Sequence, residues 1–215
     1  MLQYKAAFRQ SIFTLDIYHR MERFKWPVPA DEYFRRHITE GESTTVEYRV
    51  ERYKFLWEEF GPPADMLLIG GISSMFALDE LKRSYAYGNF MATVLLAQVF
   101  VEQTLGGSYS LAGKDDVAEK GFAGLVDASL NDGHITPQLA ETLHRLRKMR
   151  NPYTHHTGGT EKRSYMGRIA ETAFMAPEDL VVEDAKTAIR AVADYLRHGS
   201  PDWNPSKVQW SDEDV

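Results

Sequence analysis

A short segment in the second half of the chain carries side chains that could bind a phosphate and move a proton beside it. Residues 147–156 read Arg-Lys-Met-Arg-Asn-Pro-Tyr-Thr-His-His. The guanidinium of Arg150 offers a planar fork of donors that matches phosphate oxygens. The imidazoles of His155 and His156 can give or take a proton near neutral pH. With the polar side chain of Asn151 between them, these residues indicate chemistry at a phosphate group.

Positive charge is concentrated around this segment. Residues 144–163 hold six basic side chains against one acidic side chain, although the whole chain has a net charge of −6. An acidic protein is not a general coat for nucleic acid, so any contact with RNA must come from a local patch. The basic residues on both sides of the motif are the candidates for substrate binding: Arg147, Lys148, Lys162 and Arg163.

A helix must position Arg150. Thr136 followed by Pro137 is typical of an N-cap with proline in the first turn. Arg150 continues the apolar face of this helix, because it lies one helical turn after the last buried leucine. The leucines of that face are Leu139, Leu143 and Leu146.

The end of this helix decides where the histidines lie. We expect the helix to end at Asn151, because Pro152 disfavours helical geometry at the residue before it. In a continuous helix Arg150 and His155 would be about 140° apart around the axis. A break at the proline would let the chain bring His155 back over Arg150.

Both parts of the motif also have structural interpretations. An arginine on a packed face needs a partner, either a buried carboxylate or an anion at an interface. Glu102, on the expected central helix, is a candidate partner for Arg150, and we favour an ordinary helix-surface or bundle ion pair over a direct catalytic role for it. Basic residues are favoured in the last turn of a helix, and adjacent histidines often simply follow a helix end. The residues alone leave these alternatives open.

Composition excludes several other chemistries. The chain has no cysteine, which rules out disulfides, thiol catalysis and cysteine-based zinc or iron–sulfur sites. The segment from Gly107 to Lys114 has five residues between its glycines, where a P-loop requires about four. We therefore expect no metal and no cofactor. No apolar run approaches the ~20 residues of a membrane helix, and Lys5 and Arg9 interrupt any signal-peptide core, so we expect a cytoplasmic protein without membrane contact.

Helical spacing recurs along the chain and predicts an all-α fold. Residues 46–60 follow it for nearly four turns, and a strand over residues 44–50 is the less favoured alternative. We expect Gly106-Gly107 to end the apolar central helix and residues 106–116 to form a polar loop. The expected helices cover residues 46–60, 73–86, 89–105, 117–130, 136–151, 164–175 and from 177 to about 198.

These helices fall into three predicted parts. Residues 1–62 form an N-terminal helical extension that ends at Gly61-Pro62-Pro63, and residues 63–198 form the bundle. We expect the extension to pack on the bundle through Tyr53, Trp57 and Phe60. Residues 199–215 form an acidic tail whose two tryptophans need a groove if the tail is to be ordered.

The motif resembles the signature of the HEPN superfamily, in which Arg and a polar residue precede His. Arg150-Asn151 is followed by His155 with four residues between Arg and His, and by His156 with five. We prefer His155. Residues 85–90, 97 and 102–105 look like the first helix pair of this family, and the Leu143–Arg150 segment looks like its motif helix. The resemblance spans residues 70–198, and Pro152 inside the motif departs from the pattern.

The resemblance implies an antiparallel HEPN-like bundle and a metal-independent endoribonuclease, a toxin or anti-phage defence component. It implies that His155, or else His156, moves protons, that Arg150 stabilises transition-state charge and that Asn151 orients the motif. It also implies a homodimer with facing motifs, single-stranded RNA as substrate and an inhibitory antitoxin partner. The alternative is a non-catalytic module that binds nucleotide or RNA, or that serves as a dimerisation scaffold.

Overall fold

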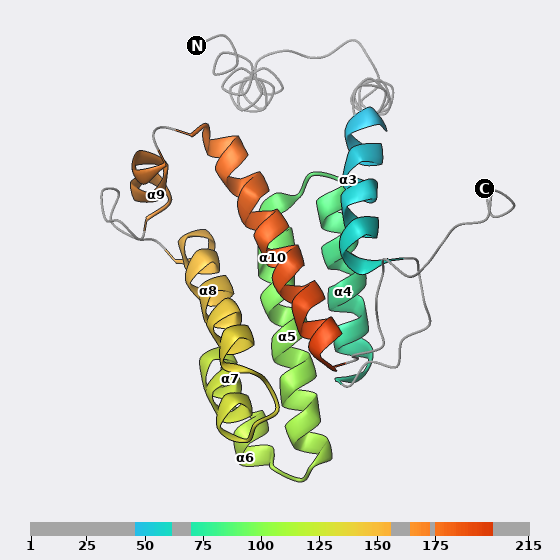
Figure 1. Cartoon of the computed structure of the whole chain (residues 1–215), viewed down its shortest axis with the longest axis vertical. Helices are drawn as coiled ribbons and strands as arrows, with labels where there is room; N and C mark the ends of the chain where they lie inside the picture. Colours follow the sequence, from blue (N-terminus) through green and yellow to red (C-terminus); the bar gives the residue numbers. More distant parts are fainter. Residues whose placement is uncertain (1–45, 62–69, 156–163, 173–174, 200–215) are drawn as a thin grey trace, which may run out of the picture. The chain divides into compact units, whose positions relative to one another are not determined.

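The computed structural model describes residues 46–61, 70–155, 164–172 and 175–199. All regular secondary structure in these residues is helical, which confirms the all-α fold class (Figure 1). The helices from Tyr48 onward belong to one compact unit. The described helices are α3 (Val46–Phe60), α4 (Gly71–Ala86), α5 (Phe90–Leu111), α6 (Asp115–Ala118), α7 (Phe122–Asn131), α8 (Pro137–Thr154), α9 (Tyr165–Glu171) and α10 (Pro177–Gly199).

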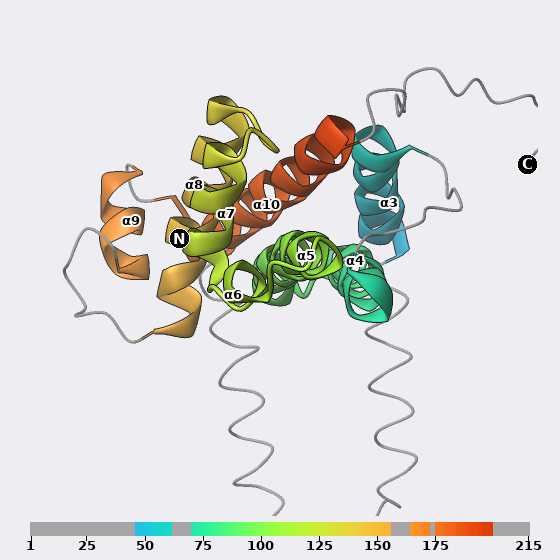
Figure 2. The same ribbon diagram turned by 90° about the horizontal axis from the view of Figure 1, so that it is seen from below.

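The helix α5 forms the centre of the bundle. It packs against α4, α6, α7, α8 and α10, and Figure 2 shows it between α4 and α6. Val94, Ala97, Phe100 and Val101 are fully buried, as expected for a helix that is apolar nearly all round. By length and composition alone α5 could cross a membrane, but the buried core helix of a soluble protein meets the same criterion.

The predicted end of α5 is wrong, because the helix continues through Gly106-Gly107 to Leu111. The glycines serve packing instead of termination. A Cβ atom on Gly107 would lie 2.5 Å from the Cα atom of Gly70 and 2.8 Å from its nitrogen. The backbone before α4 therefore crosses α5 at this point. The predicted loop over residues 106–116 shrinks accordingly, and the helix expected over residues 117–130 is divided into α6 and α7.

Several other helix predictions are confirmed. Residues 46–50 are helical and not a strand, α4 begins two residues before its predicted start, and α9 occupies part of the range 164–175. The hydroxyl of Thr136 accepts a hydrogen bond from the Leu139 amide at 3.2 Å, as its N-cap position predicted. Ala185, Ala188 and Val192 are buried on α10.

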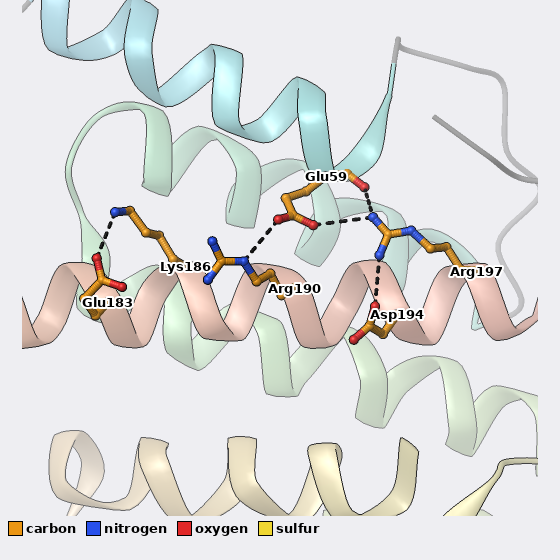
Figure 3. A network of polar contacts seen from close by, with 6 residues as sticks. All are labelled: Glu59, Glu183, Lys186, Arg190, Asp194 and Arg197. Atoms are coloured by element: carbon orange, nitrogen blue, oxygen red, sulfur yellow. Dashed lines mark hydrogen bonds and ion pairs between the residues drawn. The ribbon is translucent and has the colours of Figure 1, made fainter. Parts of the chain in front are cut away.

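The helix α3 packs on the bundle through part of the predicted face. Phe60 is buried as predicted, Trp57 is half-buried and Tyr53 is exposed, while Leu56, which was not predicted, is also buried in the core. The Glu59 carboxylate accepts hydrogen bonds from Arg190 at 3.1 Å and from Arg197 at 3.4 Å (Figure 3). The C-terminal part of α3 therefore packs as predicted, and the prediction fails only at Tyr53. The division of the chain at residue 62 stays a prediction.

Gly107→Ala should lower the free energy of unfolding by about 1–3 kcal/mol, because the new methyl group meets backbone and not a movable side chain. Gly124→Ala is the matched control. Its Cβ would meet the flexible side chain of Lys120 at 3.0 Å, and alanine is favoured over glycine in a helix by about 1 kcal/mol. Urea unfolding measures both variants, and equal stability of the two would contradict the close crossing at Gly107.

Candidate functional site

The predicted motif lies on the last turn of α8, and this turn differs from the prediction. The helix does not end at Asn151 but continues through Pro152 to Thr154. The amide of His155 donates to the carbonyl of Asn151 at 3.0 Å, and the hydroxyl of Thr154 donates to the same carbonyl at 3.3 Å. These bonds hold the turn although proline supplies no amide hydrogen.

One guanidinium nitrogen gathers the polar side chains of the motif. Nη1 of Arg150 lies 3.2 Å from Nε2 of His155, 3.0 Å from Oγ1 of Thr154 and 3.3 Å from Oδ1 of Asn151. The structure therefore brings together the predicted cation, amide and imidazole. Since a guanidinium only donates, Nε2 must act as the acceptor in this arrangement, and the ring proton belongs on Nδ1.

The solvent exposure of the motif residues increases along the last turn of α8. Arg150 and Asn151 are half-buried, while Thr154 and His155 are exposed. A phosphate can therefore approach the guanidinium from solvent without displacing the core leucines of α8. An exposed imidazole beside a permanently charged donor is suited to proton transfer at a bound phosphate ester.

Behind the motif lies a buried ionic cluster that sequence reasoning missed. Asp184 on α10 is buried, with 4% of the residue exposed in the folded chain. Both of its oxygens accept hydrogen bonds of 2.6 Å from the two terminal nitrogens of Arg168 on α9. The hydroxyl of Tyr153, on the last turn of α8, donates to the same carboxylate at 2.6 Å. The Asp184 cluster, meaning these three residues, thus joins α8, α9 and α10.

The environment of this cluster disfavours ionised tyrosine. Burial, followed by the hydrogen bond to Asp184, raises the pKa of Tyr153 well above its ordinary value. Burial raises the pKa of the neighbouring Tyr165 to about 12, and its hydroxyl donates to the carbonyl of Pro177. The hydrogen bonds to Asp184 raise the pKa of Arg168. Tyr153 therefore remains a neutral donor that fixes the end of α8.

A signal for this cluster was present in the sequence. Asp184 lies four residues after Leu180 and four before Ala188, so it falls on the buried face of an amphipathic helix. An acid in such a position needs a cationic partner. Nothing in the local pattern of the short α9 helix identifies Arg168 as that partner.

The remaining predicted residues lie apart from the guanidinium or outside the described residues. The Glu102 carboxylate accepts a hydrogen bond from Gln98 at 3.3 Å, one turn earlier on α5, and within the described residues it does not pair with Arg150. Lys148 is exposed. Nε of Arg147, one turn before Arg150, is buried and has no hydrogen-bond partner among the described residues. The predicted residues outside the described ranges are His156, Lys162 and Arg163.

The donor set does not form a metal site in the described part of the chain. No group of three or more histidine, aspartate or glutamate side chains is placed there to hold an ion. The arrangement at the end of α8 consists of one fixed cation, a second arginine one turn earlier, an amide and an imidazole. Such a set matches an anionic substrate.

Tyr153→Phe should lower the free energy of unfolding at neutral pH by about 1–3 kcal/mol, because it removes a donor from a buried carboxylate. The difference between wild type and variant should narrow as the pH rises above about 10. There the unfolded tyrosine ionises while the folded one keeps its proton, so its stabilising contribution is lost. Denaturant unfolding across pH 7–11 measures this, with the exposed Tyr48→Phe as control. A constant or widening difference would contradict the described environment of Tyr153.

Comparison of the chain with protein-family models, with curated proteins and with solved structures finds no match. The function must therefore be inferred from the chemistry of the chain's own residues. The features that bear on it are the guanidinium–imidazole contact at the end of α8 and the buried cluster that fixes this turn.

Proposed function

We propose that this chain is a metal-independent endoribonuclease of HEPN type, with Arg150, Asn151 and His155 at its catalytic centre. The observation that carries the proposal is the 3.2 Å contact between Nη1 of Arg150 and Nε2 of His155. A motif defined by spacing has chemical meaning only if the folded turn brings its cation and its base to the same point. The helix end of α8 meets that requirement.

The reaction we propose is an internal transfer at phosphorus. His155 removes the proton from the ribose 2′-hydroxyl, and the 2′-oxygen then attacks the adjacent phosphorus. The bond from phosphorus to the 5′-oxygen breaks, and that oxygen receives a proton. The products are a 2′,3′-cyclic phosphate and a 5′-hydroxyl, and neither water nor metal takes part in the step.

The contacts of Arg150 suit this role. A phosphate oxygen that replaces Nε2 of His155 at Nη1 would bind the guanidinium and free the imidazole to accept a proton. The charge that develops on the phosphorane-like transition state would lie directly on the cation. Asn151 would orient the guanidinium through Oδ1. Arg147, with its unpartnered buried Nε, and the exposed Lys148 would bind neighbouring phosphates.

A symmetric dimer completes the proposal. One imidazole cannot serve as base and acid in the same instant. In a dimer, one copy of the motif can supply the base and the other copy the acid. We therefore propose an antiparallel HEPN-like bundle that pairs its motif helices across a two-fold axis. An enzyme that cleaves single-stranded RNA in the cytoplasm would need an inhibitory protein partner, as expected for a toxin or a defence component.

One observation favours a second candidate function. Nη1 of Arg150 is already surrounded by acceptors from its own helix end. Hydrogen bonds of this kind stabilise the last turn of a helix with no substrate present. On this alternative the chain is a non-catalytic module that binds nucleotide or RNA, or that dimerises and scaffolds another protein.

Arg150→Ala and His155→Ala should each reduce cleavage of single-stranded RNA by about 10²–10⁴-fold. Arg150→Lys should also fail, because an ammonium group cannot reproduce a planar pair of donors. His156→Ala should be milder. The matched controls are Arg145→Ala and His144→Ala, which alter exposed or partly exposed side chains on the same helix.

A gel assay with RNA, DNA and RNA carrying a 2′-deoxy substitution measures these effects, with and without EDTA. Wild type should cut only substrates with a 2′-hydroxyl, and EDTA should change nothing. If the folded wild-type protein binds RNA but leaves it intact, the scaffold function replaces the enzyme. Loss of activity in His156→Ala with activity kept in His155→Ala would move the proton-transfer role to the second histidine.

The dimer can be tested with single thiols, because the chain has no cysteine of its own. Thr154→Cys places a thiol beside the motif and should form an intermolecular disulfide under mild oxidation. Asp79→Cys, exposed on α4, should not. Light scattering should give a dimer at micromolar concentration. A strict monomer, or a dimer in which only Asp79→Cys cross-links, would rule out facing motifs.

A further inference from the structure

A second site lies in a cavity that includes no residue of the motif. Its volume is about 390 Å³, and it opens where α5, α7 and the end of α10 come together. Cavities of this size hold small ligands. Apolar and aromatic side chains form most of its walls, among them Leu105, Tyr109, Ile135, Tyr195 and Leu196.

One buried polar atom at this cavity has no hydrogen-bond partner in the part of the chain that the structure describes. Ser129 is 0% exposed, and its hydroxyl makes no hydrogen bond within the described residues. A buried hydroxyl without a partner costs free energy, so it marks a place where a donor or acceptor is expected. Charged groups nearby have partners of their own. Lys114 pairs with Asp132 at 2.9 Å, and Nε2 of His198 lies 3.0 Å from the carbonyl of His134.

We propose that this cavity binds an indole ring and that its occupant is Trp203 of the same chain. An indole is largely apolar and carries one N–H group that can only donate. Aromatic walls with a single unsatisfied hydroxyl oxygen suit that combination. The proposal does not depend on ribonuclease activity, because the cavity and the motif have no residue in common.

The connection of the chain identifies the occupant. Gly199, the last residue of α10, is itself part of the cavity wall. Trp203 follows four residues later. A fully extended chain therefore places Trp203 at most about 14 Å from Gly199. Trp210 follows after eleven residues. The probability that a flexible tether closes falls with about the three-halves power of its length. If both tryptophans make equal contacts, the shorter tether therefore favours Trp203 over Trp210 by roughly fivefold.

Free 5-fluoroindole is the probe for this site, observed by ¹⁹F NMR with the full-length chain. Trp203→Ala should bind the probe at least tenfold more tightly than wild type, because it vacates the cavity. Trp210→Ala, the matched control, should behave as wild type does. Adding Ser129→Ala to Trp203→Ala should weaken binding about fivefold, the effect of one hydrogen bond.

A disulfide experiment gives a readout that needs no added ligand. Ala112 lies at the cavity and is exposed, and Asn204 adjoins Trp203. The pair Ala112→Cys and Asn204→Cys should oxidise within one chain, and much faster than the control pair Glu80→Cys and Asn204→Cys. Trp203→Ala should slow the first pair to the rate of the control.

Several results would overturn the proposal. Equal binding of the probe to wild type and Trp203→Ala would show that the tail leaves the cavity free. Binding to Trp210→Ala alone would make Trp210 the occupant. Binding to neither variant would show that the cavity does not accept an indole. Equal cross-linking rates of the two cysteine pairs would exclude docking of Trp203.

Discussion

The buried carboxylate of Asp184 fixes how three helices of the bundle meet. Taking such a charge out of water costs several kcal/mol unless close partners compensate for it. Here the compensation comes from Arg168 on α9 and Tyr153 on α8, through three hydrogen bonds of 2.6 Å. Loss of one partner from a buried pair typically destabilises a fold by about 3–5 kcal/mol. The geometry of the helix ends is therefore tied to one interaction.

This interaction bears directly on the motif. Tyr153 lies between Asn151 and His155, beyond a proline that by itself would end the helix. Because its hydroxyl is bound to a carboxylate on α10, the turn that carries it keeps a fixed position against the bundle. Arg150 can then contact His155, which lies five positions later in the chain. Preorganisation of this kind is what a site needs if it is to stabilise a transition state without rearranging.

The fold could be predicted from the sequence wherever an apolar face repeats at helical spacing. The leucines of α8 and the apolar α5 were both identified in this way. The errors occurred where a local rule for helix ends met a long-range contact. Gly107 lies inside a helix because the backbone at Gly70 crosses α5 there and leaves no room for a side chain. Pro152 is tolerated because its neighbour Tyr153 is anchored to α10.

The motif was also accessible from the sequence, because its residues are close together along the chain. The cluster that supports the motif was accessible only in part. The buried position of Asp184 has a sequence signal, but Arg168 and Asp184 come 13 and 29 residues after His155, and nothing in their spacing pairs them. The candidate pairing of Glu102 with Arg150 does not form within the described residues. The sequence predicts the helix face on which Glu102 lies but not the residue that faces it across the bundle. The Glu102 carboxylate accepts a hydrogen bond from Gln98 instead.

Amide hydrogen exchange in Asp184→Asn tests the central claim most directly. If the Asp184 cluster holds the last turn of α8, the amide of His155, bonded to Asn151 in the native fold, should lose protection together with its neighbours. Amides in the core of α8, near Leu143, should stay protected, which would show that the bundle remains folded. Unchanged protection of residues 153–155 in a folded variant would contradict the claim that this buried carboxylate positions the motif.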